Sequence, residues 1–183
     1  MMNKLIALIL FVILLPIFFI TALVIFFDDG KPIFFYQKRV GLNNSFFNII
    51  KFRTMKIGTK DIATHLVKLD EQEFLRSGQF LRKYSIDELP QLLNIIIGDL
   101  NFIGPRPALY NQYDLIEMRE MHMLHTLKPG ITGWAQVNGR DFISLEEKVS
   151  YDLYYKNNQG IKLNLKILIK TLFKVFNASD IKA

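Results

Sequence analysis

Length, composition and charge exclude several classes of protein. The chain has 183 residues, half of them hydrophobic, with 16 phenylalanines and a net charge of +6. There is no cysteine, which excludes a disulfide scaffold, and the length allows one compact domain. All 17 acidic residues and 22 of the 23 basic residues follow Phe27. We therefore expect a basic domain with anionic partners such as phosphates or lipid headgroups.

The first element is an uncharged apolar run of 23 residues, Leu5 to Phe27. As a helix it would reach about 34 Å, close to the thickness of a bilayer core. Pro16 divides the run into equal halves, and an internal proline removes a hydrogen bond and favours a kink. A mildly kinked span and a re-entrant helix that turns back at Pro16 both remain open. The flanking basic residues place the main domain on the cytoplasmic side in either case.

Two short strands are predicted over residues 31–55, separated by the turn residues 41–44. Because side chains alternate along a strand, Lys51 and Arg53 are expected on one face. Residues 57–72 are polar and irregular, which indicates a surface excursion.

Helices are predicted over residues 73–85, 87–98, 109–127 and 144–158, the last beginning with Ser144 and Glu147 at capping-box spacing. Residues 102–109 contain two closely spaced prolines and are expected to be irregular. Residues 128–141 are predicted to form a glycine-rich loop, with a short strand at most.

The final helix, residues 161–179, carries a basic stripe with a lysine at every fourth position: Lys162, Lys166, Lys170 and Lys174. Most of its remaining surface is apolar. Two interpretations are equally consistent with this pattern: a core helix with a solvated lysine edge, and an interfacial helix with its lysines near headgroup phosphates.

Asp87 and Glu88 stand just before Pro90, where proline is harmless at the start of a helix. Asp87 is a candidate N-cap; alternatively Ser85 caps the helix, with Glu88 in capping-box position. An isolated acidic pair at such a place is most often only a cap.

The surroundings of the acidic pair favour a catalytic role. Arg106 lies between two prolines in "GPRP". The prolines stiffen the backbone, so a guanidinium held there loses little entropy when it binds phosphate. "PGITGWAQVNGR" offers backbone amides, with Arg140 at its end, and such amides can hold a diphosphate. With Lys51 and Arg53, these residues indicate a site with acids, phosphate ligands and a divalent metal.

The motifs "KFRTM", "SIDELPQLLNIIIGDLNFIGPRP" and "LKPGITGWAQVNGR" resemble the bacterial sugar transferases, the polyprenol-phosphate phosphoglycosyl transferases, in their small monotopic form. The resemblance covers nearly the whole chain. It implies transfer of a sugar phosphate from a UDP-sugar to polyprenol (undecaprenyl) phosphate, with UMP as the second product. Asp87 would be the nucleophile that forms a phosphosugar-aspartyl intermediate and the ligand of Mg²⁺, and Glu88 would assist in positioning or proton transfer.

The resemblance also implies which other residues form the site. Four cationic residues would bind phosphate: Lys51, Arg53, Arg106 and Arg140. The candidates for the nucleotide pocket are Pro105, Pro107, Gly133, Trp134, Gln136 and Asn138. Trp134 fits a packing role equally well.

The implied fold is α+β and mostly helical. Residues 1–27 would form a re-entrant membrane segment, and residues 28–183 a catalytic domain with interfacial amphipathic helices at the cytoplasmic face of the bacterial inner membrane. The family's membrane helix breaks at a Ser-Pro pair, and here the pair is Leu15-Pro16. The expected partners are the two substrates, membrane lipids, and either a second copy of the chain or downstream glycosyltransferases, but not nucleic acid.

Two competing functions belong to other classes. A non-enzymatic basic membrane module that binds lipid or a partner explains the apolar run and the lysine stripe, but not "DELPQ" or "GPRP". A membrane-bound phosphohydrolase would use water in place of the lipid phosphate as acceptor.

Overall fold

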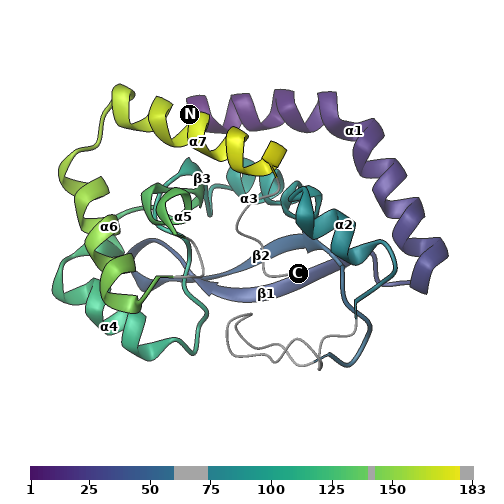
Figure 1. Ribbon diagram of the computed structural model, residues 1–183, viewed down its shortest axis with the longest axis horizontal. Coiled ribbons are helices and arrows are strands. Elements are labelled where there is room, and N and C mark those ends of the chain that lie inside the picture. The colour runs from purple at the N-terminus through teal and green to yellow at the C-terminus, as the bar shows by residue number, and fades with distance from the viewer. Residues whose placement is uncertain (60–73, 140–142, 178–183) are drawn as a thin grey trace. The chain divides into compact units, whose positions relative to one another are not determined.

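The computed structural model describes residues 1–59, 74–139 and 143–177 (Figure 1). These residues divide into two compact units, the first holding 1–37 and 49–96, the second 38–48 and 97–177. The chain is mostly helical with two small two-stranded sheets, which confirms the α+β expectation. The apolar segment 1–27 belongs to the first unit. The predicted surface excursion at 57–72 lies almost entirely outside the described residues.

Helix α1 (Met2–Asp29) is continuous over 28 residues and includes Pro16. Of the described helices it is the only one long and apolar enough to cross a membrane. Figure 1 shows that α1 bends near its middle, the part of the helix that holds Pro16. Loss of one backbone hydrogen bond at proline accounts for a bend there.

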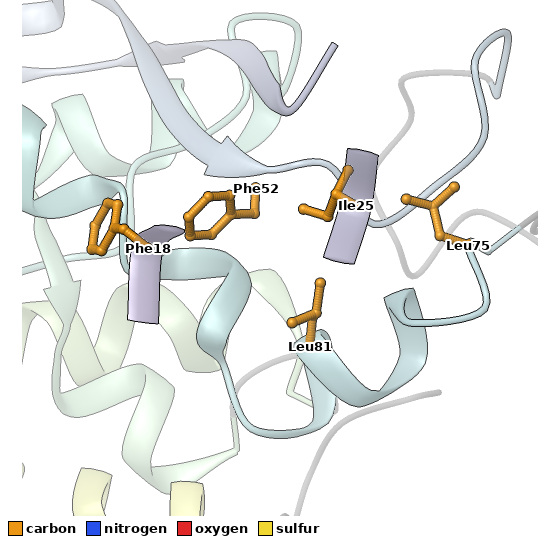
Figure 2. Close-up of a cluster of buried hydrophobic side chains, with 5 residues drawn as sticks. All are labelled: Phe18, Ile25, Phe52, Leu75 and Leu81. Carbon is orange, nitrogen blue, oxygen red and sulfur yellow. The ribbon is translucent and has the colours of Figure 1, made fainter. Parts of the chain in front are cut away.

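The second half of α1 packs into the core of the first unit (Figure 2). Phe18 and Ile25 join Phe52, Leu75 and Leu81 in one buried cluster. The rings of Phe18 and Phe52 meet edge to face with centroids 5.3 Å apart. This half of the apolar run is therefore covered by protein along one side, as burial of its aromatic surface favours.

Strands β1 (Phe34–Val40) and β2 (Phe46–Phe52) form a two-stranded sheet, which confirms the two predicted strands. The turn between them is a short 3-10 segment, Leu42–Asn44. Its two asparagines have positive φ angles of 51° and 58°, a conformation that asparagine tolerates better than most residues.

The helices of the first unit are shorter than predicted. Helix α2 is Gly78–Lys83, a 3-10 turn follows at Ile86–Glu88, and α3 is Gln91–Ile97. The predicted end near Gly98 is confirmed, because this glycine has a φ of 113°.

The second unit is built around a parallel pair, β3 (Asn101–Ile103) and β4 (Gly130–Thr132). Its helices are α4 (Tyr113–Met121), α5 (Trp134–Asn138), α6 (Leu145–Asn157) and α7 (Ile161–Asn177), with a 3-10 turn at Leu124–Thr126. Buried side chains form two clusters: Ala108, Leu115, Leu124 and Val149, then Val137, Tyr155 and Ile167.

Three sequence predictions in the second unit were wrong. Residues 102 and 103 extend strand β3, whereas an irregular segment was expected. The helix predicted over 109–127 is interrupted at Met123, whose φ is 54°. The glycine-rich loop contains a helix, α5, in addition to a strand. For β3 and β4, pairing between distant segments outweighs weak local propensity.

The capping box of α6 is confirmed: Ser144 Oγ accepts from Glu147 N, and Glu147 accepts from Ser144 N. We expect Ser144→Ala to lower the free energy of unfolding by about 1 kcal/mol, because an amide at the helix start loses its acceptor. Thermal melting checks this, with Ser144→Asp as the matched control that keeps a cap. Equal melting of the alanine and aspartate variants would contradict the assignment.

Candidate active site

Asp87 and Glu88 occupy a 3-10 turn, Ile86–Glu88, that precedes α3. The side chains of Ile86 and Leu89 pack against the core cluster of the first unit. In a 3-10 turn residues three apart lie on the same side, so the two acids point away from that cluster. Asp87 is nonetheless only 7% exposed. The turn thus presents two adjacent carboxylates, and its apolar residues Ile86 and Leu89 anchor it in the core.

The capping prediction for this pair was wrong. Ser85 has a left-handed backbone (φ 55°) and its side chain makes no capping bond. Pro90 stands between the acidic turn and the first residue of α3, Gln91, so neither Asp87 nor Ser85 is the N-cap of that helix. The acidic pair therefore lies in its own 3-10 turn before α3 rather than at the N-cap of that helix.

Strand β2 contacts both the acidic turn and the helix that follows it, α3. Lys51 Nζ lies 2.8 Å from Glu88 Oε1, and both side chains are mostly buried, at 15% and 12% exposed. One residue earlier, Ile50 N donates to Asn94 Oδ1 of α3 at 3.0 Å. Pairing of a partly buried carboxylate with an ammonium fixes its direction.

Arg53 joins the end of β2 to the end of α1. Its guanidinium donates to Asp29 Oδ2 at 2.5 Å and to the backbone oxygens of Asp29, Gly30 and Pro32 at 3.0, 2.9 and 2.6 Å. Four of its donors thus have protein acceptors. The predicted phosphate contact of Arg53 stays a prediction, and the role that the geometry supports is to position strand β2 against helix α1.

We expect Arg53→Lys to lower the free energy of unfolding by about 2–3 kcal/mol. The ammonium group of lysine lacks the planar fork of a guanidinium, so it cannot reach all four acceptors, and some of the carbonyl oxygens of Asp29, Gly30 and Pro32 lose their donor. Arg76→Lys on the exposed surface is the matched control. Chemical denaturation of both variants measures the difference, and similar midpoints would contradict the role of Arg53.

Parallel pairing in the second unit brings two predicted loops together. Asn101 pairs with Gly130 and Ile103 with Thr132, so both strands end at the same edge. The segment 104–107, which contains Pro105 and Pro107 and is called the proline loop below, follows β3, and Gly133 follows β4. A Cβ on Gly133 would lie 2.1 Å from the Gly104 oxygen, which leaves room only for glycine. The proline loop and the glycine-rich segment are therefore in direct contact, as at the ligand-binding edge of other parallel sheets.

The proline loop is held by successive backbone carbonyls. The oxygens of Pro105, Pro107 and Ala108 accept from Gly130 N, Arg39 Nη1 and Val40 N at 3.0, 3.0 and 2.9 Å. The Arg106 oxygen accepts from Arg119 Nη1 at 2.9 Å. These bonds hold the backbone that carries the Arg106 side chain, so Arg106 is a candidate ligand residue on a pre-organised segment.

Arg119 is itself held by a buried carboxylate. Its Nη2 and Nε lie 2.6 and 3.1 Å from Asp152 Oδ2 in α6, and Asp152 is 1% exposed. Burial raises the pKa of Asp152, and the charge of Arg119 opposes that effect. Sequence reasoning missed this pair, because nothing in the local pattern links residues 33 positions apart.

Helix α5 carries the remaining pocket candidates. Gln136 is 8% exposed, and neither of its amide atoms has a hydrogen-bond partner among the described residues. Buried amides without partners are uncommon, which makes this side chain a candidate for contact with a ligand. The ring of Trp134 stacks on Tyr154 with centroids 5.5 Å apart, and Asn138 accepts from Lys170 Nζ at 2.7 Å.

The predicted site residues thus fall into two groups. Lys51, Arg53, Asp87 and Glu88 belong to the first unit, whereas Pro105, Arg106, Pro107, Gly133, Trp134, Gln136 and Asn138 belong to the second. Arg140 lies outside the described residues. Within the described ranges no group of three or more histidine, aspartate or glutamate side chains is placed to hold a metal ion.

Comparisons with known proteins identify the family. The family model "Bacterial sugar transferase" matches residues 1–178. An uncharacterized sugar transferase of Bacillus subtilis, EpsL, is 45% identical over 153 residues, covering 84% of this chain and 74% of that protein. The exopolysaccharide production protein ExoY of Sinorhizobium fredii is 33% identical and covers 93% and 81% respectively.

A longer relative has a named reaction. The UDP-glucose:undecaprenyl-phosphate glucose-1-phosphate transferase of Escherichia coli is 33% identical over 177 residues. The match covers 93% of this chain but 38% of that protein, so the chain corresponds to only part of it. This chain belongs to the bacterial sugar transferase family, which confirms the resemblance of its motifs.

Proposed function

We propose that this protein transfers a sugar phosphate from a UDP-sugar to polyprenol phosphate through a covalent intermediate on Asp87. The observation that carries the proposal is the acidic turn. In it a mostly buried Asp87 lies beside a Glu88 that is paired with Lys51, and the turn is anchored in the apolar core by Ile86 and Leu89. Relatives named undecaprenyl-phosphate glucose-1-phosphate transferases support this class of reaction.

The reaction proceeds in two displacements. A carboxylate oxygen of Asp87 attacks the sugar-bearing phosphorus, the bond to the bridging oxygen breaks, and UMP leaves with that oxygen. An oxygen of the lipid phosphate then attacks the same phosphorus, which releases Asp87 and forms the polyprenol-diphosphate-sugar. A carboxylate nucleophile divides one difficult displacement into two easier ones.

Glu88 and Lys51 orient the acidic turn during both steps. Their 2.8 Å ion pair joins the turn to strand β2 and holds the Glu88 carboxylate in one direction. Glu88 is therefore placed to position a substrate group or to receive a proton beside the nucleophile.

The residues present fit Mg²⁺ as the metal. Magnesium is usually held by one or two carboxylates together with substrate phosphates and water, and Asp87 supplies one such carboxylate. When bound, the ion would neutralise charge on the phosphoryl oxygens.

The second unit supplies groups suited to the donor. Arg106 is a phosphate ligand on a backbone fixed by the Arg119 contact. The amide of Gln136 has both a donor and an acceptor to offer to a uracil edge or a sugar hydroxyl. Arg140 and Lys51 remain proposed phosphate ligands.

We further propose that α1 is re-entrant and that the domain lies at the cytoplasmic face. Phe18 of α1 lies 11 residues before Asp29 and still packs against Phe52 of the first unit. A helix leaving the domain along the membrane normal would carry Phe18 about 16 Å away from it. The bend near Pro16 supports the same proposal.

Analysis of the nucleotide product tests the proposed reaction. The full chain, held in nanodiscs, is incubated with a panel of UDP-sugars, Mg²⁺ and undecaprenyl phosphate. Release of UMP that requires the lipid establishes transfer of a sugar phosphate, and the responsive donor names the sugar. Release of UDP would contradict the covalent scheme. Release of UMP and free sugar phosphate without lipid would identify a hydrolase, and absence of any product would favour the lipid-binding module.

A further inference from the structure

The only tryptophan of the chain lies beside two lysines of α7. Lys166 Nζ is 5.2 Å and Lys170 Nζ is 4.9 Å from the centroid of the Trp134 ring. The two lysines are one helical turn apart, so they approach the indole from the same helix. Asn138 accepts from Lys170 Nζ at 2.7 Å, which fixes that ammonium group beside the ring. Trp134, Lys166 and Lys170, with Asn138, are called the indole–lysine cluster below.

The indole–lysine cluster concentrates positive charge. Neither Lys166 nor Lys170 forms an ion pair with a carboxylate of the described part of the chain. Partial burial and the nearby charges of Lys166 and Lys174 lower the pKa of Lys170. Repulsion between neighbouring ammonium groups disfavours this arrangement, and an anion placed between them would relieve it.

Exposed apolar side chains run beside the lysines on α7. Leu165, Ile169 and Phe173 each immediately precede a lysine, so an apolar row lies next to the basic row along the helix. Leu172 and Phe176 extend the apolar surface, and both are well exposed. A hydrocarbon chain attached to an anion matches this combination of a cationic edge and an apolar row.

We propose that the indole–lysine cluster binds the phosphate headgroup of a lipid phosphate monoester, with the hydrocarbon chain along the apolar row of α7. The inference rests on the proposed function, in which such a monoester is the acceptor. A phosphate monoester carries close to two negative charges near neutral pH, whereas a phospholipid diester carries one. Two converging ammonium groups therefore match the monoester better. Trp134 then belongs to the lipid site rather than to the nucleotide pocket.

Fluorescence of Trp134 reports directly on this site, because no other tryptophan contributes. The full chain in zwitterionic detergent is titrated, without any nucleotide sugar, with a short isoprenyl phosphate, with dihexanoyl phosphatidylglycerol and with inorganic phosphate. We expect the isoprenyl phosphate to change the emission at concentrations at least about tenfold lower than either of the other two.

Three variants locate the response. Lys166→Gln/Lys170→Gln should weaken binding of the isoprenyl phosphate at least about tenfold, because two charged donors are lost. Lys166→Arg/Lys170→Arg keeps the charges and should retain most of the binding. Lys162→Gln is the matched control, since it removes a lysine of the same stripe that lies one helical turn before Lys166 and outside the indole–lysine cluster. Circular dichroism establishes that each variant is folded.

Several results would overturn the proposal. Equal responses to the monoester and to phosphatidylglycerol would mean a general anionic surface, and an equal response to inorganic phosphate would mean that the lipid chain plays no part. If Lys162→Gln weakened binding of the isoprenyl phosphate as much as the double glutamine variant does, the phosphate would not be bound specifically beside Trp134. Because these titrations involve no turnover, they separate failure of the lipid site from failure of the transfer reaction. In an active enzyme the double glutamine variant should raise KM for the lipid and leave KM for the sugar donor unchanged.

Discussion

Asp87→Asn is expected to lower the rate of lipid-dependent UMP release at least about a thousandfold, the scale seen when a nucleophile is removed from a catalytic group of residues. Asparagine has nearly the same shape as aspartate but no anionic oxygen to attack phosphorus. The apolar residues that anchor the turn in the core, Ile86 and Leu89, are unchanged, so the fold should be retained. Measurement of UMP by chromatography under saturating donor and lipid checks the prediction. Asp114→Asn, on the exposed start of α4, is the matched control.

A second readout tests the covalent step itself. Donor labelled in the sugar-bearing phosphate should leave label on the wild-type chain after rapid denaturation, in the absence of lipid acceptor. Asp87→Asn should retain none. Glu88→Gln should still be labelled, at a lower rate, because Glu88 assists rather than attacks. Label that persists in Asp87→Asn would move the nucleophile elsewhere, and label abolished only in Glu88→Gln would exchange the two roles.

Asp152→Ala is expected to cause the largest loss of stability, about 3–5 kcal/mol, because it leaves the charge of Arg119 partly buried without its partner. For a chain of this length the melting temperature would fall by roughly 6–20 °C. Thermal unfolding in detergent, followed by circular dichroism, measures the change. Asp114→Ala, an exposed aspartate, is the control. A fall no larger than that of the control would show that the buried pair contributes little.

A double variant separates stability from function at the same place. Arg119→Met/Asp152→Leu removes both charges and should recover most of the lost stability. It also removes the donor that holds the Arg106 oxygen at 2.9 Å. We therefore expect a stable protein with a raised KM for the nucleotide sugar. A double variant with unaltered KM would mean that the Arg119 contact does not position Arg106.

Several local features were predictable because their causes are local. The two strands at 34–52, the end of α3 near Gly98 and the capping box of α6 all depend on residues within a few positions of one another. The long apolar helix follows from composition alone. The errors arose where a distant segment decides the backbone. Helix α5 forms after a strand that pairs with β3, and the acidic turn is shaped by packing of Ile86 and Leu89.

The sequence by itself determined the family, the apolar helix and the chemical types of the site residues, because motif identity and hydrophobic patterning are properties of the chain alone. Only the tertiary structure decided what those side chains contact. It directs Arg53 to the end of α1, and it joins Arg106 to Asp152 through Arg119. It also brings the proline loop against Gly133. These contacts join residues 13 to 33 positions apart in the sequence, and their energies depend on burial and geometry that no local pattern encodes.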